Sequence, residues 1–174
     1  MTDLTLGDIE RLLAAGADRP VTGSHSQLDH ALQTAAVLRE RVPGDEELAV
    51  AGLVHDIGHL LPGVDDASHA AAGAAAVREA LGERVAGLVG LHVEAKRYLV
   101  ASEGTYGGEL APDSVSSLAL QGGPMSADEC VVFSALPYAA AAVELRRADE
   151  SGKVPGLVIP GWGEWSGALR RAQR

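Results

Sequence analysis

Residues 53–59 read Leu53-Val54-His55-Asp56-Ile57-Gly58-His59, so that polar side chains follow directly on an apolar run. The run begins near Leu48 and is apolar on every side, which predicts a central, buried helix over 46–61. A buried imidazole or carboxylate costs free energy unless it is paired or coordinated. A hydrogen bond between His55 and Asp56 is the simpler interpretation. A metal site is the alternative, with His59 one turn after His55 on the same face.

Further histidines and an aspartate lie on other expected helices, close to their apolar faces. Imidazole is the commonest metal ligand in neutral proteins, and a carboxylate can bridge two cations. If the helices bring these side chains together, the sequence predicts a buried binuclear metal centre. The residues of this expected centre are His30, His55, Asp56, His69, His92 and Asp149.

The pattern of apolar residues predicts an all-α fold, a helical bundle around this centre. Hydrophobic residues make up 47% of the chain and aromatic residues only 3%, so the core must consist of Ala, Leu and Val, and Ala and Leu favour helix. No convincing strand appears. We expect one domain over 1–174, with a core at 26–156, an N-terminal helix and lid loop at 1–25, and a C-terminal segment at 157–174. The expected helices span 4–15, 26–41, 46–61, 68–82, 83–100, 113–120, 126–134 and 137–151, with a Gly-rich loop at 101–113.

The formal net charge of −10 argues against nucleic-acid binding, because phosphates would be repelled. An anionic substrate would then need a local basic pocket. Cys130 is the only cysteine, which excludes an intramolecular disulfide and fits a reducing cytoplasm. The N-terminal residues lack the pattern of a signal peptide, and no apolar run is long enough to span a bilayer. We therefore expect a cytoplasmic protein without a membrane partner, and leave its oligomeric state open.

The spacing of His30, His55-Asp56 and Asp149 matches the H…HD…D pattern of the HD-domain superfamily, most of whose members are metal-dependent phosphohydrolases. His69 and His92 match the additional pair of its binuclear branches. Longer runs within 26–156 resemble the HD-domain mixed-valent diiron oxygenases, distant relatives of myo-inositol oxygenase that cleave the carbon–phosphorus bond of α-hydroxyphosphonates. These runs are SQLDHALQ at 26–33, LVHDIGH at 53–59, HVEAKRYL at 92–99, SLALQGGPMS at 117–126 and LRRAD at 145–149.

The resemblance implies an O2-dependent enzyme that converts a small hydroxyphosphonate into a carboxylate and phosphate. Its cofactor would be a pair of iron ions in the Fe(II)/Fe(III) state, with O2 as co-substrate. His30, His55 and Asp149 would hold one iron, His69 and His92 the other, and Asp56 would bridge them. Mixed nitrogen and oxygen ligation suits iron or manganese, so the choice of iron rests on the resemblance alone.

A phosphonate dianion needs cations and hydroxyl or amide donors around it. Lys96 lies four residues after His92, and Arg146 lies three residues before Asp149, so each shares a helix face with an expected ligand. Surface charges remain an alternative interpretation of Lys96 and Arg146, and Ser114 could serve only as a helix cap. The residues that we expect to contact the substrate are His59, Lys96, Ser114, Ser117, Arg146 and Gln33.

One part of the family pattern is missing. Members that act on amino or trimethylammonio substrates carry Tyr-x-Gly-Glu before the first ligand, where the Tyr caps an iron and the Glu helps to read the cationic amine. This chain has Pro20 and Gly23 at the Tyr and Glu positions. We hypothesise that its substrate lacks the ammonium group, or that His25 or Asp29 contributes to the lid instead.

Two other functions remain open at this point. A hydrolase of the same superfamily would use the binuclear centre to activate water and attack a phosphoester or nucleotide. A sensor or accessory protein would bind a phosphonate or a metal without turnover. Consumption of O2 distinguishes the oxygenase from both.

Overall fold

Helices account for nearly all the regular structure in the computed structural model, which describes residues 3–22 and 25–174. The all-α prediction is confirmed. The elements are α1 (Leu6–Ala15), η1 (Gly16–Asp18), β1 (Pro20–Thr22), β2 (His25–Ser26), α2 (Gln27–Arg41), α3 (Glu46–Val54), η2 (Ile57–Leu60), α4 (His69–Ser102), α5 (Tyr106–Glu109), α6 (Pro112–Leu120), α7 (Ala127–Ser134), α8 (Ala139–Ser151) and α9 (Trp162–Ala172), where η marks a 3-10 helix.

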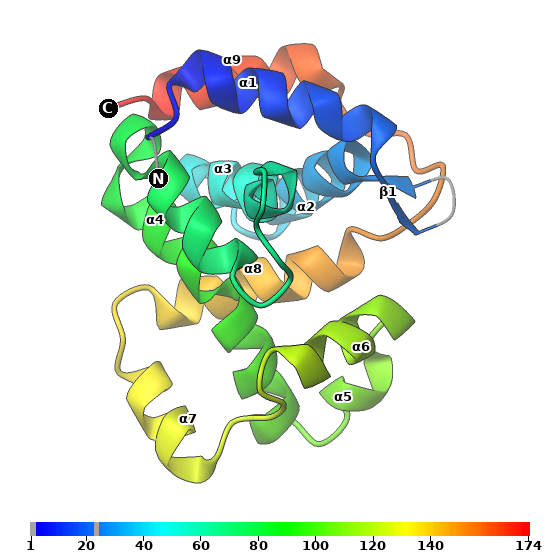
Figure 1. Ribbon diagram of the computed structural model, residues 1–174, viewed down its shortest axis with the longest axis vertical. Helices are drawn as coiled ribbons and strands as arrows, with labels where there is room; N and C mark the ends of the chain where they lie inside the picture. The colour runs from blue at the N-terminus through cyan, green and yellow to red at the C-terminus, as the bar shows by residue number, and fades with distance from the viewer. Residues whose placement is uncertain (1–2, 23–24) are drawn as a thin grey trace.

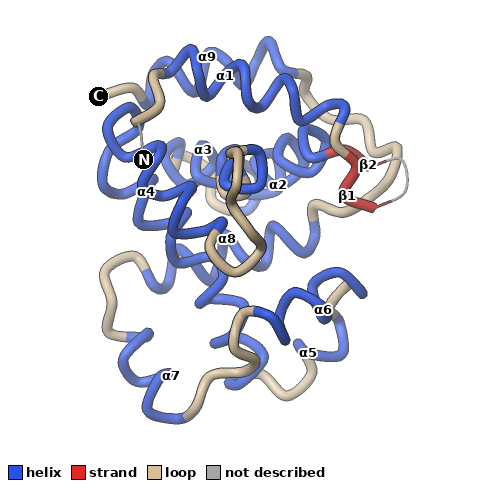
Figure 2. The backbone as a smooth tube through the Cα atoms, in the orientation of Figure 1, coloured by secondary structure: helices blue, strands red, loops and turns tan. Residues whose placement is uncertain are grey.

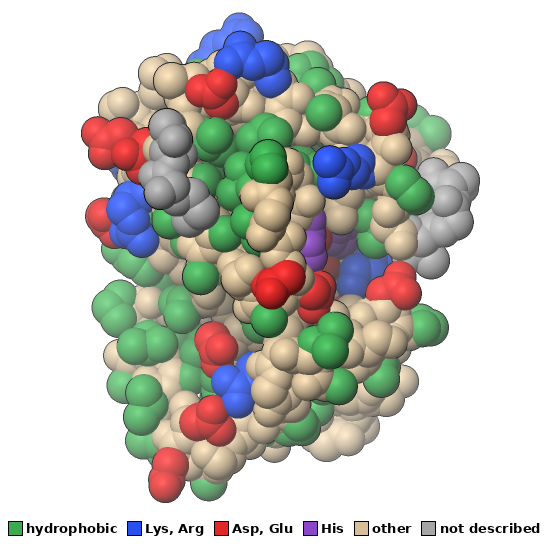
Figure 3. Space-filling view, viewed as in Figure 1, with side chains coloured by type: hydrophobic (Ala, Val, Ile, Leu, Met, Phe, Trp, Pro, Cys, Tyr) green, Lys and Arg blue, Asp and Glu red, His purple; other side chains and the backbone are tan. Residues whose placement is uncertain are grey.

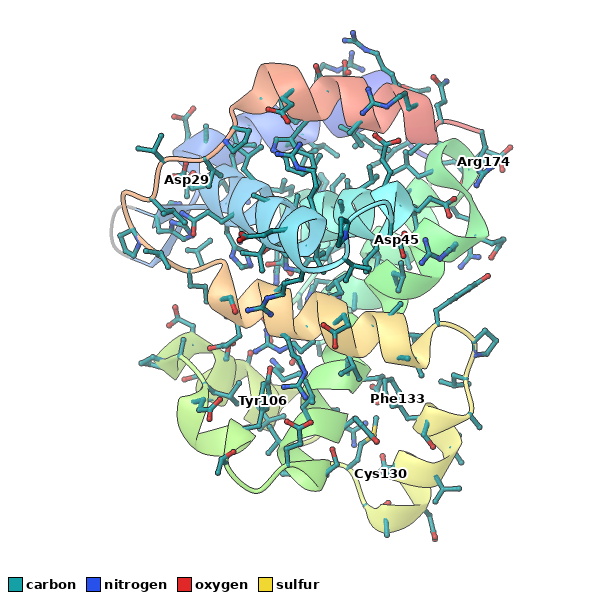
Figure 4. The ribbon with its side chains drawn as sticks, turned by 180° about the vertical axis from the view of Figure 1, so that it is seen from behind. Asp29, Asp45, Tyr106, Cys130, Phe133 and Arg174 are labelled. Atoms are coloured by element: carbon teal, nitrogen blue, oxygen red, sulfur yellow. The ribbon has the colours of Figure 1, made fainter. Side chains whose placement is uncertain are left out.

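The helices form stacked layers along the long axis of the molecule (Figure 1). At one end α1 and α9 lie side by side and cover α2 and α3, while α8 crosses beneath α2 and α3. The opposite end consists of α5, α6 and α7, which Figure 4 shows from behind with Tyr106 and Phe133 below α8. The long helix α4 connects the two ends. This arrangement places α2, α3, α4 and α8 at the centre, where α3 and α8 each contact the other three.

The central helix α3 is buried after its first two residues, as the uniformly apolar run predicted. Every residue from Leu48 to Val54 is buried, and the side chains around this helix are mostly Ala, Leu and Val. Trp165 of α9 closes the core from the outer layer with only 1% of its surface exposed. Burial of these aliphatic groups supplies the main favourable free energy of the fold.

The helix predicted over 46–61 is wrong at its C-terminal end. The α-helix stops at Val54, Asp56 leaves helical geometry at φ −97° and ψ 10°, and the chain continues as the short helix η2. A straight helix would send the adjacent side chains of His55 and Asp56 to different faces, 100° apart. The break turns both toward the same point, and the uniform run of apolar residues before it gives no periodic signal for such a break.

Other boundaries also differ from the sequence prediction. The absence of strands was wrong, because β1 and β2 form a short antiparallel hairpin at the edge of the molecule (Figure 2). The helices predicted at 68–82 and 83–100 are the two halves of α4, which kinks at Gly82 with φ 83°. The expected loop at 101–113 contains α5, and α8 begins at Ala139 after Tyr138 adopts a left-handed φ of 70°.

Both ends of the described chain are fastened to the first half of α4. The Leu4 N–H donates to the Ala76 carbonyl at 3.0 Å, and the Arg174 N–H donates to the Ala80 carbonyl at 3.1 Å. These bonds hold the outer layer of α1 and α9 in place. Within 3–22 and 25–174, no helix has both the length and the apolar composition needed to cross a bilayer.

Replacement of Gly58 by Ala should destabilise the protein strongly. A Cβ at Gly58 would lie 2.0 Å from the carbonyl oxygen of His69, a backbone atom that cannot move without shifting α4. We expect the free energy of unfolding to fall by about 3 kcal/mol, the upper range for overpacking. Urea denaturation measures it. The matched control is Gly104→Ala, where no atom lies within 4 Å, and it should change stability by less than about 1 kcal/mol. Equal midpoints for the two variants would contradict the close approach.

Candidate metal centre

The six expected metal ligands come from distant parts of the chain and lie together in the structure. His30 is in the first turn of α2, and Asp149 is in the last turn of α8. His55 and Asp56 occupy the break between α3 and η2. His69 begins α4, and His92 lies in its second half.

The carboxylate of Asp56 is at the middle of this cluster. Its Oδ1 lies 3.5 Å from the Nε2 of His55 and 3.6 Å from the Nε2 atoms of both His69 and His92. Its Oδ2 lies 3.7 Å from the Nε2 of His30. Distances of this size are too long for good hydrogen bonds and leave room for cations between the groups.

The remaining ligand atoms divide into two ends around Asp56. The Oδ1 of Asp149 lies 3.1 Å from the Nε2 of His30 and 3.9 Å from that of His55. At the other end, the Nε2 atoms of His69 and His92 are 3.0 Å apart. The two groups are the same as those that the family resemblance implies for the two ions, with Asp56 between them.

Backbone carbonyls fix the orientation of all four imidazoles. A carbonyl only accepts hydrogen bonds, so each Nδ1 that faces one carries a proton, and each Nε2 faces inward. This second layer of bonds is typical of metal-ligating histidines. The pairs are His30 with Gly152 at 2.9 Å, His55 with Gly52 at 2.8 Å, His69 with Asp66 at 2.6 Å, and His92 with Val89 at 2.7 Å.

Three of the four inward-facing nitrogens, those of His55, His69 and His92, have no carboxylate or carbonyl oxygen at hydrogen-bond distance among the described contacts, which is the feature that fits a metal. The Nε2 of His55 is buried without a hydrogen bond, and the Nε2 atoms of His69 and His92 face each other. Burial, followed by the neighbouring imidazoles of His55 and His69, lowers the pKa of His92 to about 3, so this ring stays neutral. Burial opposes ionisation of Asp56, but the surrounding histidines outweigh it and hold the pKa of this carboxyl well below its usual value. A cage of imidazole nitrogens and ionised carboxylates suits divalent cations.

The centre lies at the bottom of a pocket of about 250 Å³. Figure 3 shows histidine atoms at the floor of this hollow, with Lys or Arg and Asp or Glu atoms beside them. Pro20 and Val21 of the hairpin, Val93 of α4 and Ser117 of α6 contribute to the walls. The pocket therefore connects the metal cage to solvent and has room for one small molecule.

Lys96 faces this pocket and is almost completely buried. Its exposed fraction is 5%, and its Nζ donates to the Oγ of Ser117 at 2.7 Å. Burial, and next the positive charge of Arg146, lowers the pKa of Lys96 to about 8. The other charged groups that act on it are Lys153, which adds to this effect, and Asp149 and Asp66, which oppose it.

Arg146 and Ser114 also line the pocket, joined by one carboxylate. Arg146 is 2% exposed and pairs with Asp149 and Glu150, and its Nη2 donates to the Oγ of Ser114 at 3.2 Å. Ser114 donates to the Oε2 of Glu150 at 2.9 Å. Lys153 donates to the same serine at 2.7 Å and to Glu150 at 3.1 Å.

Sequence reasoning missed Lys153 and Glu150. Lys153 lies past the C-terminus of α8, beyond Gly152, so helical spacing from Asp149 gave no signal for it. Glu150 gave no signal, because a glutamate next to a ligand on a charged helix is ordinarily solvated.

Among the expected substrate contacts, Gln33 needs correction and His59 has a second possible role. Gln33 does not line the pocket, because both ends of its amide bond the main chain of Val154, at 2.8 and 3.0 Å. His59 does line it, with its Nε2 4.0 Å from the Oδ1 of Asp56 and its ring stacked on His69 at 3.9 Å. Asp56, His59 and His69 also form a triad of metal-ligating atoms, so the structure offers His59 as a ligand as well as a substrate contact.

The alternatives offered for the lid are also wrong. His25 is 3% exposed and donates to the Gly152 carbonyl at 3.2 Å, so it is neither a surface residue nor turned into the pocket. Asp29 accepts the N–H and the hydroxyl of Ser26 and caps α2. Pro20 forms part of β1 and the pocket wall, and Gly23 lies outside the described residues.

Comparison with known proteins agrees with this geometry. The chain is 38% identical to a hydroxymethylphosphonate dioxygenase of Gimesia maris over 146 residues, which cover 79% of this chain and 72% of the relative. It is 33% identical to a [1-hydroxy-2-(trimethylamino)ethyl]phosphonate dioxygenase (glycine-betaine-forming) of Leisingera caerulea over 151 residues, which cover 82% of this chain and 76% of the relative. A model of the HD domain matches residues 28–135, more than half of the chain. The chain therefore belongs to the HD domain family.

Proposed function

We propose that this protein is an O2-dependent oxygenase that uses two iron ions to cleave the carbon–phosphorus bond of a small α-hydroxyphosphonate. The products are a carboxylate and inorganic phosphate. One molecule of O2 balances the reaction, because R–CH(OH)–PO3²⁻ and O2 together contain the atoms of R–COOH and HPO4²⁻. No other oxidant or reductant is needed.

A single feature carries the proposal: the metal cage and a basic wall share one small pocket. Four imidazoles and two carboxylates surround the floor, and Lys96, Arg146 and Lys153 line the side. The names of the two relatives support the same chemistry, because both are dioxygenases of hydroxyphosphonates. The ligand types would also accept manganese, so iron remains part of the proposal.

The basic wall would bind the phosphonate. Lys96 uses one of its three N–H donors on Ser117, which leaves two for phosphonate oxygens. Arg146 and Lys153 are already paired with Asp149 and Glu150. They would therefore attract the phosphonate by their positive charge more than by donating hydrogen bonds to it. Against a net charge of −10, this local wall is what would draw an anion to the site.

The chain's own residues position the reacting carbon rather than transform it. Bound iron would supply the redox chemistry with O2, which amino-acid side chains cannot provide. The phosphonate contacts would hold the hydroxyl-bearing carbon above the floor of the pocket, next to Asp56 and His59. Val93, Pro20 and Val21 would keep water away from that side.

Turnover of hydroxymethylphosphonate tests the proposed function directly. With the iron-loaded protein in air, we expect one O2 consumed and one phosphate released for each substrate, measured with an oxygen electrode and a phosphate assay. The control is His55→Ala, which removes a buried ligand and should abolish both signals. Release of phosphate under nitrogen, at the rate seen in air, would contradict the oxygenase and support a hydrolase of the same family.

The charge of Lys96 should give the reaction an alkaline limit. The ammonium form binds an anion, and it predominates below the lowered pKa of about 8, so kcat/KM should fall as the pH rises past that value. In Lys96→Arg the side chain keeps its charge, and the decline near pH 8 should disappear even if activity is lower. A pH profile of kcat/KM for both proteins measures this. An unchanged alkaline limit in the arginine variant would assign it to another group.

A substrate without an ammonium group should be preferred. Because His25 and Asp29 are occupied elsewhere and position 23 is a glycine, we expect kcat/KM for hydroxymethylphosphonate to exceed that for 2-amino-1-hydroxyethylphosphonate by at least about tenfold. Steady-state assays of both compounds measure the ratio. Asp66→Asn is the matched variant, because Asp66 is a carboxylate on the pocket wall. If wild type preferred the amino compound and Asp66→Asn lost that preference, Asp66 would be shown to bind the ammonium group, and the expectation would be refuted.

A further inference from the structure

The carbonyl oxygen of Gly152 accepts hydrogen bonds from two imidazole rings. The Nδ1 of His30 donates to it at 2.9 Å, and the Nε2 of His25 donates to it at 3.2 Å. Both rings are buried, with 1% and 3% of their surface exposed, and they meet edge to face with centroids 6.1 Å apart. One of the two rings belongs to the metal cage, and the other does not.

The position of this carbonyl is tightly fixed. Gly152 follows α8 directly, three residues after Asp149. A Cβ at this position would lie 2.6 Å from the Oγ1 of Thr34 and 2.9 Å from its backbone N. Only glycine, which has no Cβ, therefore lets the backbone approach α2 this closely. The carbonyl therefore serves as a rigid acceptor between α2, α8 and the hairpin.

His25 connects this acceptor to the pocket wall. It lies in β2, which pairs with β1, and β1 supplies Pro20 and Val21 to the pocket. The position of the wall and the orientation of the His30 ring thus depend on the same oxygen atom. The hairpin that forms the pocket wall is therefore linked to His30, an expected metal ligand, through the hydrogen bonds that His25 and His30 both donate to Gly152.

The same arrangement occurs at the other end of the cage. The Asp66 carbonyl accepts the Nδ1 of His69 at 2.6 Å and also the Nε2 of Gln121 at 3.3 Å, and Gln121 lines the pocket. His55 and His92 also donate to backbone carbonyls, but the described hydrogen bonds include no second side-chain donor to either carbonyl. A shared acceptor therefore occurs at one histidine of each group in the cage, His30 and His69.

We propose that His25 is a positioning residue that orients His30 through the shared Gly152 carbonyl and so sets the affinity of the cage for one of its two metal ions. The proposal rests on the metal centre of the proposed function and goes beyond it, because His25 is neither one of the expected ligands nor one of the residues that line the pocket. Residues that orient metal ligands typically change metal affinity by about 10- to 100-fold when they are removed.

Titration of the metal-free protein with Mn²⁺ tests this without any turnover, because the EPR signal of the free ion reports binding. Wild type should bind two Mn²⁺ ions tightly. In His25→Phe, which keeps a ring but loses the donor, one of the two dissociation constants should rise by about 10-fold or more. In His25→Gln, the amide N–H can replace the donor, and both constants should return to within about threefold of wild type.

Phe133→Leu is the control for general loosening of the fold. Phe133 lies in α7, away from the cage; it is 2% exposed, and its ring centroid is 4.9 Å from that of Tyr98. The Phe133→Leu variant should have a lower melting temperature in the metal-free form, with both Mn²⁺ dissociation constants unchanged. Wild-type binding by His25→Phe, equal weakening in the Phe133 variant, or failure of His25→Gln to restore affinity would each overturn the proposal.

The experiment also separates this proposal from the proposed function. If wild type binds two Mn²⁺ ions but its iron form consumes no O2 with hydroxymethylphosphonate, the oxygenase fails and the role of His25 stands or falls on the Mn²⁺ constants alone. If wild type does not bind two ions, the metal centre and the role of His25 are both refuted.

Discussion

The fold gathers the Nε2 atoms of four imidazoles around the carboxylate of Asp56, at the centre of an otherwise aliphatic bundle. Local pairing compensates for this only in part: the Nε2 of His30 lies 3.1 Å from Asp149, but that of His55 is left without a partner. The arrangement persists because each ring is held from behind by a backbone carbonyl and because the helices that supply the carbonyls are packed into the core. The packing of the aliphatic core thus offsets the unfavourable free energy of gathering these polar groups in the interior.

Close backbone contacts transmit this support to the ligands. Gly58 packs against the carbonyl of His69, and Gly152 packs against Thr34 of α2. Both glycines are adjacent to segments that carry expected ligands. At each of them the main chain contacts the neighbouring helix directly, with no side chain between. Rigid elements of this kind hold a site more accurately than loops can, which suits a reaction that depends on the placement of one carbon atom.

The sequence predicted the helical fold, the buried α3 and the residues that meet at the cage, because His and Asp on apolar faces leave a clear pattern. It could not predict the break after Val54, since a helix that is apolar on all sides has no periodicity to interrupt. It also misplaced Gln33 and His25, whose partners are main-chain groups of Val154 and Gly152. Any residue type presents the same N–H and C=O, so such bonds leave no trace in composition or spacing.

The bond between His30 and Gly152 joins positions 122 residues apart. A chain emerges from the ribosome N-terminus first, so His30 is made well before the carbonyl that orients its ring. The orientation of His30 therefore waits until α8 and Gly152 have been made and packed against α2. Until that point the aliphatic core is what holds the emerging helices together, so a complete set of oriented side chains is a result of folding and not its starting point.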